Sequence, residues 1–516
     1  MTVTTKPPGY PPAIHGPWPS DSPWGRHWSG ASRPATTATI LAIGAGAAVA
    51  AISLPLDRAG VGWLVTAVAG TIALILAGAV PARRPPGAPE PLVTAPKRNR
   101  SPDRYAWSAA TVALLAVGTF RSAGWLFLLC LATAALTGTL ALTGGHSLRS
   151  IAAGVTMPPI AAFRALPWLA RGASRLRRPA EAAANVRVAA TVAVSIALLT
   201  VFGALFASAD AAFADALSRL SPSVSAGATA RWIFVFVVAV LALGGAAFLR
   251  AGPPDLSGLD TTEGRKVSRF EWALPLGLLV LLFAGFVAVQ LAVLFGGNRH
   301  VLETDGLTYA EYARSGFWQL CFVTALTLVV LAGAARWAPR TTPADRRTIR
   351  VVLGALAVLT LVIVASALHR ITLYADTYGL TRLRLLVACC EAWFGLVLLL
   401  VLVAGIRMRA AWLPRVAIAA GVLALLGLAA ANPDRLIAEH NVRQDHNLDL
   451  AYLGSLSPDA VPGLAGLDPA RRECVLGHID LWLSEHPDDW RSWNLGRERA
   501  RTIIARDLSG PGWFCP

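Results

Sequence analysis

The chain has 516 residues, of which 55% are hydrophobic and 15% charged, and its formal net charge is +16. A soluble globular protein carries about 25% charged residues, so this composition argues against a soluble fold and indicates a membrane protein. The Lys and Arg residues lie between apolar runs instead of gathering on one polar domain, which argues against a nucleic-acid partner.

Apolar runs long enough to cross a bilayer recur along the chain. A helix needs about 20 residues to span the hydrocarbon core, and in lipid a helix satisfies its own backbone hydrogen bonds. Two weaker runs come first and stronger ones follow: 36–54, 61–80, 105–120, 123–143, 186–208, 230–249, 270–296, 316–335, 349–369, 382–406 and 411–430. We therefore predict an all-α, polytopic bundle of about eleven transmembrane helices.

Polar segments divide this bundle. We expect residues 1–35 to form a disordered, Pro-rich cytoplasmic tail and residues 36–80 to form a pair of transmembrane helices. Residues 81–104 are expected to form a Pro- and Arg-rich cytoplasmic linker. Residues 105–430 form the main bundle of about nine spans. Within it, 146–180 mixes apolar residues with arginine and proline, and we interpret it as a helix in the membrane interface. A re-entrant segment and a plain loop are the alternatives.

The basic residues indicate the orientation. If the N-terminus is cytoplasmic and the spans alternate, the inner segments hold 28 Lys and Arg residues and the outer connections hold 9. Positive charge collects on the cytoplasmic side of membrane proteins, so this excess predicts an N-in, C-out topology. The expected location is a bacterial cytoplasmic membrane, with membrane lipids as partners.

The last segment, 431–516, is polar, and its apolar residues are periodic instead of continuous. Residues 468–486 repeat apolar positions every three or four residues, as an amphipathic helix does. A second helix is expected from Pro487 to about Arg506, and a shorter one near 447–456. We predict a small extracytoplasmic α-helical domain.

Two of the six cysteines, Cys474 and Cys515, lie in this last segment. Paired cysteines in a small extracytoplasmic domain are typical of a disulfide bond, which we predict here. Two free thiols are the alternative.

Polar residues near the outer ends of the spans are candidates for ligand binding. Arg370, Arg382 and Arg384 flank a connection that contains Tyr374 and Asp376. Guanidinium groups bind phosphate and carboxylate through paired hydrogen bonds, so this cluster predicts a site for an anionic ligand. Anchoring of the helix ends at the membrane interface is the alternative.

Asp210, Glu311 and Arg314 complete this candidate outer-face cluster. Asp210 and Asp215 are five residues apart and do not share a helix face, so they do not indicate a paired-carboxylate catalyst. Glu311 and Arg314 can pair at i, i+3 on an amphipathic helix.

Two polar residues are expected at membrane depth. Glu391 lies about 13–15 Å into the span 382–406, at 1.5 Å per residue, and Gln290 lies in the span 270–296. Polar groups at this depth are costly, so each is a functional candidate by default, and Glu391 could carry a proton or couple transport. A neutral acid hydrogen-bonded to a neighbouring helix is the alternative for Glu391.

Several catalytic motifs are absent: G-x-x-x-x-G-K-[ST], H-E-x-x-H, C-x-x-C and G-x-S-x-G. ATP-driven transport, zinc proteolysis and serine hydrolysis by this chain are therefore disfavoured. We expect no metal and no cofactor.

Six stretches together resemble a family of bacterial polytopic membrane proteins, domain-of-unknown-function family 4173, which is close to family 4153. They are VFGALFASADAAFADAL at 201–217, YAEYARSGFWQL at 309–320, ALHRITLYADTYGLTRLRLL at 367–386, ANPDRLIAEHNV at 431–442, DLAYLGSLSPDAVPGL at 449–464 and WRSWNLGRERAR at 490–501. The resemblance implies a multi-span body followed by a short polar C-terminal region. It implies no known activity.

Three functions remain open from the sequence. The first is a non-enzymatic envelope or signalling component that binds a ligand or protein partner at its outer face. The second is a secondary transporter that uses Glu391 and Gln290. The third is a membrane-embedded enzyme that acts on a lipid-linked substrate, with Asp210 or Glu311 beside the arginine cluster.

Overall fold

The computed structural model describes Trp28, residues 30–79, 102–174, 226–256, 268–295, 317–339, 342–407, 410–444 and 448–508, with Leu259 and a few single residues between 195 and 210. These residues form helices and connections and contain no strand, which confirms the all-α class.

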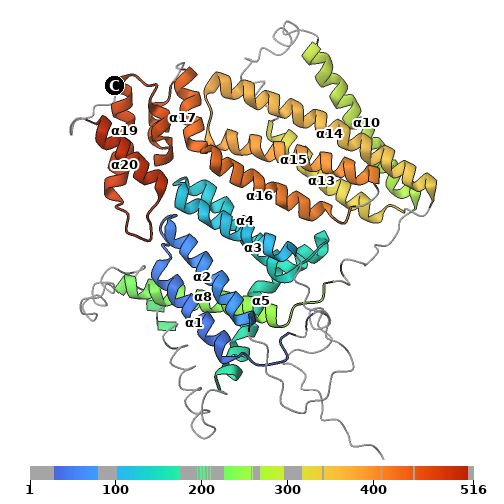
Figure 1. Ribbon diagram of the computed structural model, residues 1–516. Helices are drawn as coiled ribbons and strands as arrows, with labels where there is room; N and C mark the ends of the chain where they lie inside the picture. The colour runs from blue at the N-terminus through green and yellow to red at the C-terminus, as the bar shows by residue number, and fades with distance from the viewer. Residues whose placement is uncertain are drawn as a thin grey trace, which may run out of the picture.

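The helices fall into a long bundle and a group of shorter C-terminal helices (Figure 1). The bundle contains α1 (Thr37–Ser53), α2 (Val61–Ala79), α3 (Pro102–Phe120), α4 (Gly124–Thr143), α5 (Leu148–Ser174), α8 (Ala226–Ala251), α10 (Arg269–Phe295), α13 (Phe317–Trp337), α14 (Pro343–Tyr378), α15 (Arg382–Arg407) and α16 (Leu413–Ala431). The C-terminal region, residues 433–508, contains α17 (Pro433–Gln444), α18 (Leu450–Gly454), the 3-10 helix η1 (Pro458–Leu464), α19 (Pro469–Glu485) and α20 (Leu495–Asp507).

Eight helices of the described chain are long and apolar enough to cross a membrane: α2, α4, α8, α10, α13, α14, α15 and α16. Their apolar side chains face outward to a large extent, since the share of each apolar window that is buried inside the protein runs from 11% in α2 to 44% in α4. Outward apolar faces suit lipid, and a multi-pass membrane protein has this arrangement. Of the other three expected spans, α1 is apolar but shorter, α3 is a helix outside this set, and 186–208 lies mostly beyond the described residues.

The bundle helices run between two ends that polar contacts identify. At one end, Arg415 at the start of α16 pairs with Asp103 at the start of α3 and donates to the carbonyls of Gly144 and Gly145 after α4. We call this the basic end. At the other end, which we call the capped end, Arg121 after α3 donates to carbonyls in the last turn of α16.

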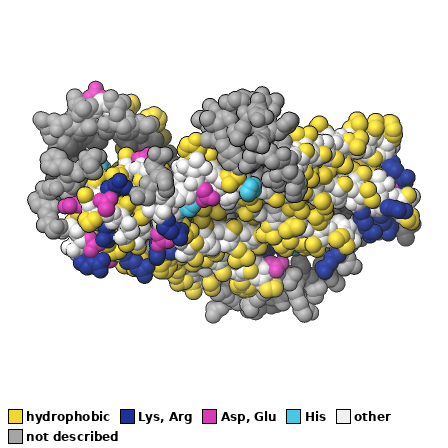
Figure 2. Space-filling view, turned by 90° about the horizontal axis from the view of Figure 1, so that it is seen from above, with side chains coloured by type: hydrophobic (Ala, Val, Ile, Leu, Met, Phe, Trp, Pro, Cys, Tyr) yellow, Lys and Arg dark blue, Asp and Glu magenta, His cyan; other side chains and the backbone are white. Residues whose placement is uncertain are grey.

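Charge differs between the two ends of the molecule. Figure 2 shows hydrophobic side chains over the middle, mixed charge over the C-terminal region and Lys and Arg at the opposite end. Arg336, Arg346, Arg347 and Arg350, at the end of α13 and the start of α14, belong to that basic end. This pattern is typical of a protein with one apolar belt and two polar ends.

The segment predicted as an interfacial helix is the continuous helix α5. Its three prolines, Pro158, Pro159 and Pro167, do not interrupt it. A proline inside a helix removes a backbone hydrogen bond and so destabilises the helix. Close packing of α5 against α8 compensates for this loss of stability. Gly245 of α8 lies against the backbone of Ala162. In Figure 1, α5 runs across the direction of α1, α2 and α4.

Helix α14 is longer than the predicted span 349–369. A capping box between Thr342 and Asp345 begins it, and Gly379, with a φ of 76°, ends it. The prediction of an outer connection is therefore wrong for residues 370–378, which continue α14. Tyr374 and Asp376 lie in the last turns of this helix. Hydropathy alone missed this end, since the helix continues beyond its apolar part.

The C-terminal region has its own apolar core, which includes Ile437, Leu453, Leu464, Leu476 and Ile479. The predicted helix 468–486 corresponds to α19. The second predicted helix begins later than expected, at Leu495, because the side chain of Asn494 accepts a hydrogen bond from the Arg497 amide and caps α20. The prediction omitted α17 and η1.

Candidate functional site

An ion pair with a buried carboxylate joins the C-terminal region to α15. Arg382, the first residue of α15, donates from Nε and Nη2 to the two carboxylate oxygens of Asp434 in α17, at 3.2 and 2.7 Å. Asp434 is fully buried and also accepts from Trp125 Nε1 and from the Ser457 amide. Four donors therefore converge on one carboxylate from α4, α15 and the start of η1.

A second buried carboxylate, that of Asp459 in η1, lies against the start of α4. Asp459 Oδ2 accepts from the backbone amides of Ser122, at 2.7 Å, and Ala123, at 3.1 Å. The Ala123 amide is one of the free donors at the start of α4, and a carboxylate at this position is favoured by the helix dipole. Asp459 Oδ1 has no hydrogen-bond partner among the described residues. Burial raises the pKa of Asp459, against the opposing effect of the two amides and Arg121.

A third set of contacts binds the connection between α1 and α2. Arg497 is 1% exposed and pairs with Asp488 at 3.0 Å, while its Nη2 donates to the carbonyl of Ala59. Arg58 from the same connection lies 3.7 Å from Asp488. The Val61 amide donates to the carbonyl of Trp493, so backbone and side chains both hold the C-terminal region to the bundle.

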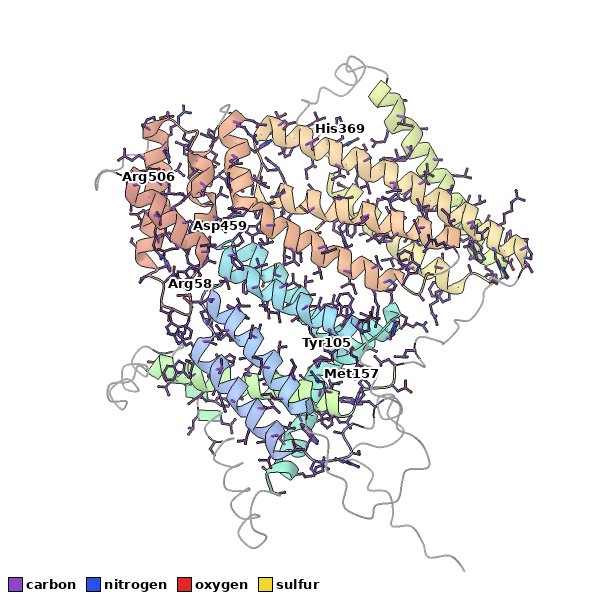
Figure 3. All side chains as sticks on the ribbon, viewed as in Figure 1. Arg58, Tyr105, Met157, His369, Asp459 and Arg506 are labelled. Carbon is purple, nitrogen blue, oxygen red and sulfur yellow. The ribbon has the colours of Figure 1, made fainter. Side chains whose placement is uncertain are left out.

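Two asparagines complete this junction. Asn494 Nδ2 donates to the carbonyls of Gly118 and Arg121 at the end of α3. Asn441 of α17 binds both the amide and the carbonyl of Leu380. The described connections that join α1 to α2, α3 to α4 and α14 to α15 are thus each hydrogen-bonded to residues 433–508. Figure 3 shows Arg58 and Asp459 at the border between the bundle and the C-terminal helices, and Arg506 farther out.

The residues predicted to form an outer-face cluster bind different neighbours. Arg384 stacks over the ring of Tyr374 at 4.3 Å and donates to the carbonyls of Tyr378 and Gly379. Asp376 lies near α17, where Gln444 donates to it at 3.4 Å. Arg382 is engaged with Asp434, as described above. These contacts bind helix ends to one another.

Of the other members of the predicted cluster, the structure describes Asp210 and Arg370. Asp210 is exposed, and its amide donates to the carbonyl of Phe206. Glu311 and Arg314 lie outside the described residues. Arg370 Nη2 donates to Gln290 Oε1 at 3.0 Å.

The two residues expected at membrane depth lie on different helices. Gln290 of α10 accepts from Arg370 and from Ser366 of α14. Glu391 of α15 is 1% exposed and faces Cys321 and Thr324 of α13, but neither carboxyl oxygen meets a donor in hydrogen-bond geometry within the described chain. An apolar cavity lies between α13, α14, α15 and α16 at the basic end of the bundle, and neither Gln290 nor Glu391 lines it.

The cysteines divide into two groups. Cys130, Cys321, Cys389 and Cys390 are free. Cys474 of α19 is buried and disulfide-bonded, whereas Cys515 lies outside the described residues. In the described part of the chain, no group of three or more His, Cys, Asp or Glu residues could hold a metal ion.

The comparison with protein families identifies the family of this chain. The model of a domain of unknown function, DUF4153, matches residues 109–467. The chain belongs to this family. The resemblance expected from the sequence thus holds for family 4153, and family 4173 itself is not shown. No curated protein and no solved structure matches the chain.

The DUF4153 match covers only part of the junction. Arg382, Asp434 and Asp459 lie inside the matched residues, whereas Asp488 and Arg497 lie beyond them. Sequence reasoning gave no role to Asp459, Asn494 or Arg497. Their signal was weak, since each is a single polar residue within a polar segment, and only the folded chain shows that each is buried.

Proposed function

We propose that the protein lies in a bacterial cytoplasmic membrane with its N-terminus in the cytoplasm and residues 433–508 outside. The excess of Lys and Arg in the segments assigned to the cytoplasm supports this orientation. The disulfide-bonded state of Cys474 supports it too, because disulfides persist in oxidising compartments. The pairing we propose is Cys474 with Cys515.

We further propose that the protein is a non-enzymatic envelope or signalling component that presents its C-terminal region to a ligand or protein partner. The observation that carries this proposal is the Arg382–Asp434 pair, whose carboxylate is fully buried, together with the buried Arg497–Asp488 pair. Burying charges costs free energy even when they are paired. Such contacts add orientation more than stability, and a fixed orientation is what a recognition surface needs.

A recognition surface is available on α19. Leu481 is 48% exposed and Trp482 is 39% exposed, and the indole of Trp482 stacks on His486. Exposed tryptophan is enriched where proteins bind partners. Neither residue belongs to the apolar core of the C-terminal region, and their exposed side chains can contact an envelope partner.

Photo-crosslinking in the native membrane tests this function. A benzophenone amino acid replaces Trp482 in one variant and Trp337 in another. Trp337 is the matched control, because it is also an exposed tryptophan but lies at the basic end. We expect a discrete protein or polymer adduct from position 482 only, and its loss when Asp434→Ala frees the C-terminal region. Adducts to lipid alone from both positions would contradict the proposal.

Transport is the second candidate, and Glu391 favours it. A buried carboxyl group that makes no hydrogen bond within the described residues is an expensive feature to retain in a membrane. Proton uptake by reconstituted vesicles, compared between the natural chain and Glu391→Gln, tests this candidate. An enzyme is the least supported of the three, because Arg382 and Arg384 are engaged in contacts within the chain.

A further inference from the structure

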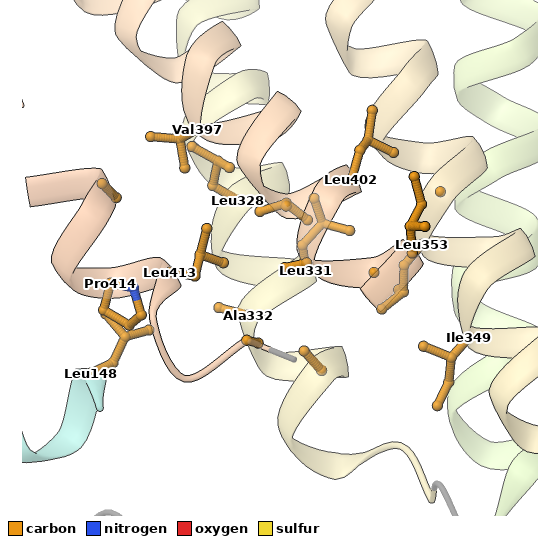
Figure 4. Close-up of a pocket in the computed structure, with 18 of the residues that line it drawn as sticks. Leu148, Leu328, Leu331, Ala332, Ile349, Leu353, Val397, Leu402, Leu413 and Pro414 are labelled. Carbon is orange, nitrogen blue, oxygen red and sulfur yellow. The ribbon is translucent and has the colours of Figure 1, made fainter. Parts of the chain in front are cut away.

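An apolar cavity of about 420 Å³ lies at the basic end of the bundle. It is enclosed by α13, α14, α15 and the start of α16, and Leu148 of α5 closes one side next to Pro414 (Figure 4). Its walls carry Leu331, Leu353 and Leu402. Small-molecule sites measure about 300–1,000 Å³, so the cavity is large enough for a ligand.

Two glycines keep this cavity open. Gly354 of α14 and Gly405 of α15 both line it, and a Cβ atom added to either would meet no heavy atom within 4 Å. Any larger side chain at these positions would therefore project into empty space. The chemistry of the walls suits a hydrocarbon chain, because the lining is apolar apart from one charged side chain.

That charged side chain is Arg350. Arg149 follows the lining residue Leu148, and Arg407 follows the lining residue Ile406. All three arginines are exposed. None of them forms an ion pair within the described residues, unlike Arg269 and Arg415 at the same end of the bundle.

We propose that this cavity binds an acyl chain of an anionic phospholipid whose phosphate is bound by Arg350, with Arg149 and Arg407 beside it. Guanidinium groups bind phosphate through charge-assisted hydrogen bonds. Basic pockets between transmembrane helices bind anionic headgroups in the same way. A free phosphate would leave the apolar cavity unfilled, and an uncharged lipid would leave the arginines unpaired.

Native mass spectrometry of the purified full-length chain tests this site. The probes are dioleoyl phosphatidylglycerol and dioleoyl phosphatidylcholine, added separately to delipidated protein. Gly354→Phe and Gly405→Phe fill the cavity from two different helices, so one of them remains informative if the other misfolds. Gly285→Phe is the control, because Gly285 of α10 also has open space beside it but lies outside the cavity.

We expect phosphatidylglycerol to bind the natural chain and Gly285→Phe alike, and each cavity variant to bind about tenfold less. Arg350→Gln should lower phosphatidylglycerol binding about tenfold and phosphatidylcholine binding much less, because the choline ammonium group of the latter neutralises its phosphate. Arg171→Gln, which changes an exposed arginine at the far end of α5, should have no effect. Unchanged binding by both cavity variants, or equal binding of the two lipids, would overturn the proposal.

Discussion

Arg382 and Asp434 join the first turn of α15 to the first turn of α17 by two parallel hydrogen bonds. Burial raises the pKa of Asp434, but the hydrogen bonds and charge of Arg382, with the contacts from Ser457, outweigh burial and leave that pKa below its ordinary value. Asp434 therefore binds as a carboxylate, and it depends on Arg382 for compensation of its buried charge.

Replacement of Asp434 by alanine should weaken the attachment of the C-terminal region to the bundle. Removing one partner of a buried ion pair costs about 3–5 kcal/mol, and we expect the lower part of that range because the side chain of Arg382 is 33% exposed and can reach water. Hydrogen exchange of the amides in α17–α20 measures the loss as faster exchange.

A matched control lies on the same helix. Glu439 pairs with Arg435 at i, i+4 on the surface of α17, and exposed pairs of this kind contribute about 0–1 kcal/mol. Glu439→Gln should leave the exchange rates nearly unchanged. If the two variants behave alike, the Arg382–Asp434 pair does not hold the region in place.

Replacement of Asp459 by asparagine should change the stability of the protein in a way that depends on pH. Because the pKa of Asp459 is raised in the folded protein, its contribution to stability is fully present below the unfolded pKa of about 4 and is lost as pH rises through the folded pKa. An asparagine carbonyl still accepts from Ser122 and Ala123 and carries no charge. The stability of Asp459→Asn relative to the natural chain should therefore increase from pH 4 upward.

Asp434 provides the contrast for this experiment. Its lowered pKa makes its contribution present above about pH 4 and lost as pH falls through the folded value. Thermal unfolding in detergent at pH 4.5 and pH 8 separates the two carboxylates. A loss of stability in Asp459→Asn that grows with pH would show that the Asp459 carboxylate is stabilised by the start of α4, against our expectation.

The sequence was a good guide to the apolar part of the fold. Runs of about 20 apolar residues predicted α4, α8, α10 and α13 with bounds close to those observed, because hydrophobic length alone decides whether a helix suits a bilayer. The same criterion placed the end of α14 too early. The helix end depends there on Gly379, whose positive φ ends the helix, and hydropathy carries no information on that.

The site was predicted only in part. Arg382 was a candidate because of its charge next to a span, but its partner Asp434 lies 52 residues later, and no periodicity joins positions so far apart. Asp459, Asn494 and Arg497 were missed for the same reason. Their roles depend on where the C-terminal region packs, which is a property of the tertiary fold.

Chemical labelling tests the proposed disulfide between Cys474 and Cys515. In denaturant without a reductant, an alkylating reagent should label four of the six cysteines, since Cys130, Cys321, Cys389 and Cys390 are free. A digest under the same conditions should contain a peptide that joins Cys474 to Cys515. Labelling of all six cysteines before reduction would contradict the pairing.

Labelling of introduced cysteines should reveal the orientation. Ser484 lies on the exposed side of α19 and Ser174 at the exposed end of α5. In a background that keeps Cys474 and Cys515 but lacks the other four cysteines, Ser484→Cys should react with a membrane-impermeant maleimide in intact cells. Ser174→Cys should react only after the membrane is opened.

The two positions act as controls for each other, because any leak in the membrane would label both. The distribution of basic residues predicts which of the two positions is labelled in intact cells. An inverted chain would place the connections that carry 28 Lys and Arg residues on the outer side, against the electrical preference that orients membrane proteins. Labelling of Ser174→Cys alone in intact cells would therefore overturn the proposed topology, and with it the assignment of residues 433–508 to the outer face.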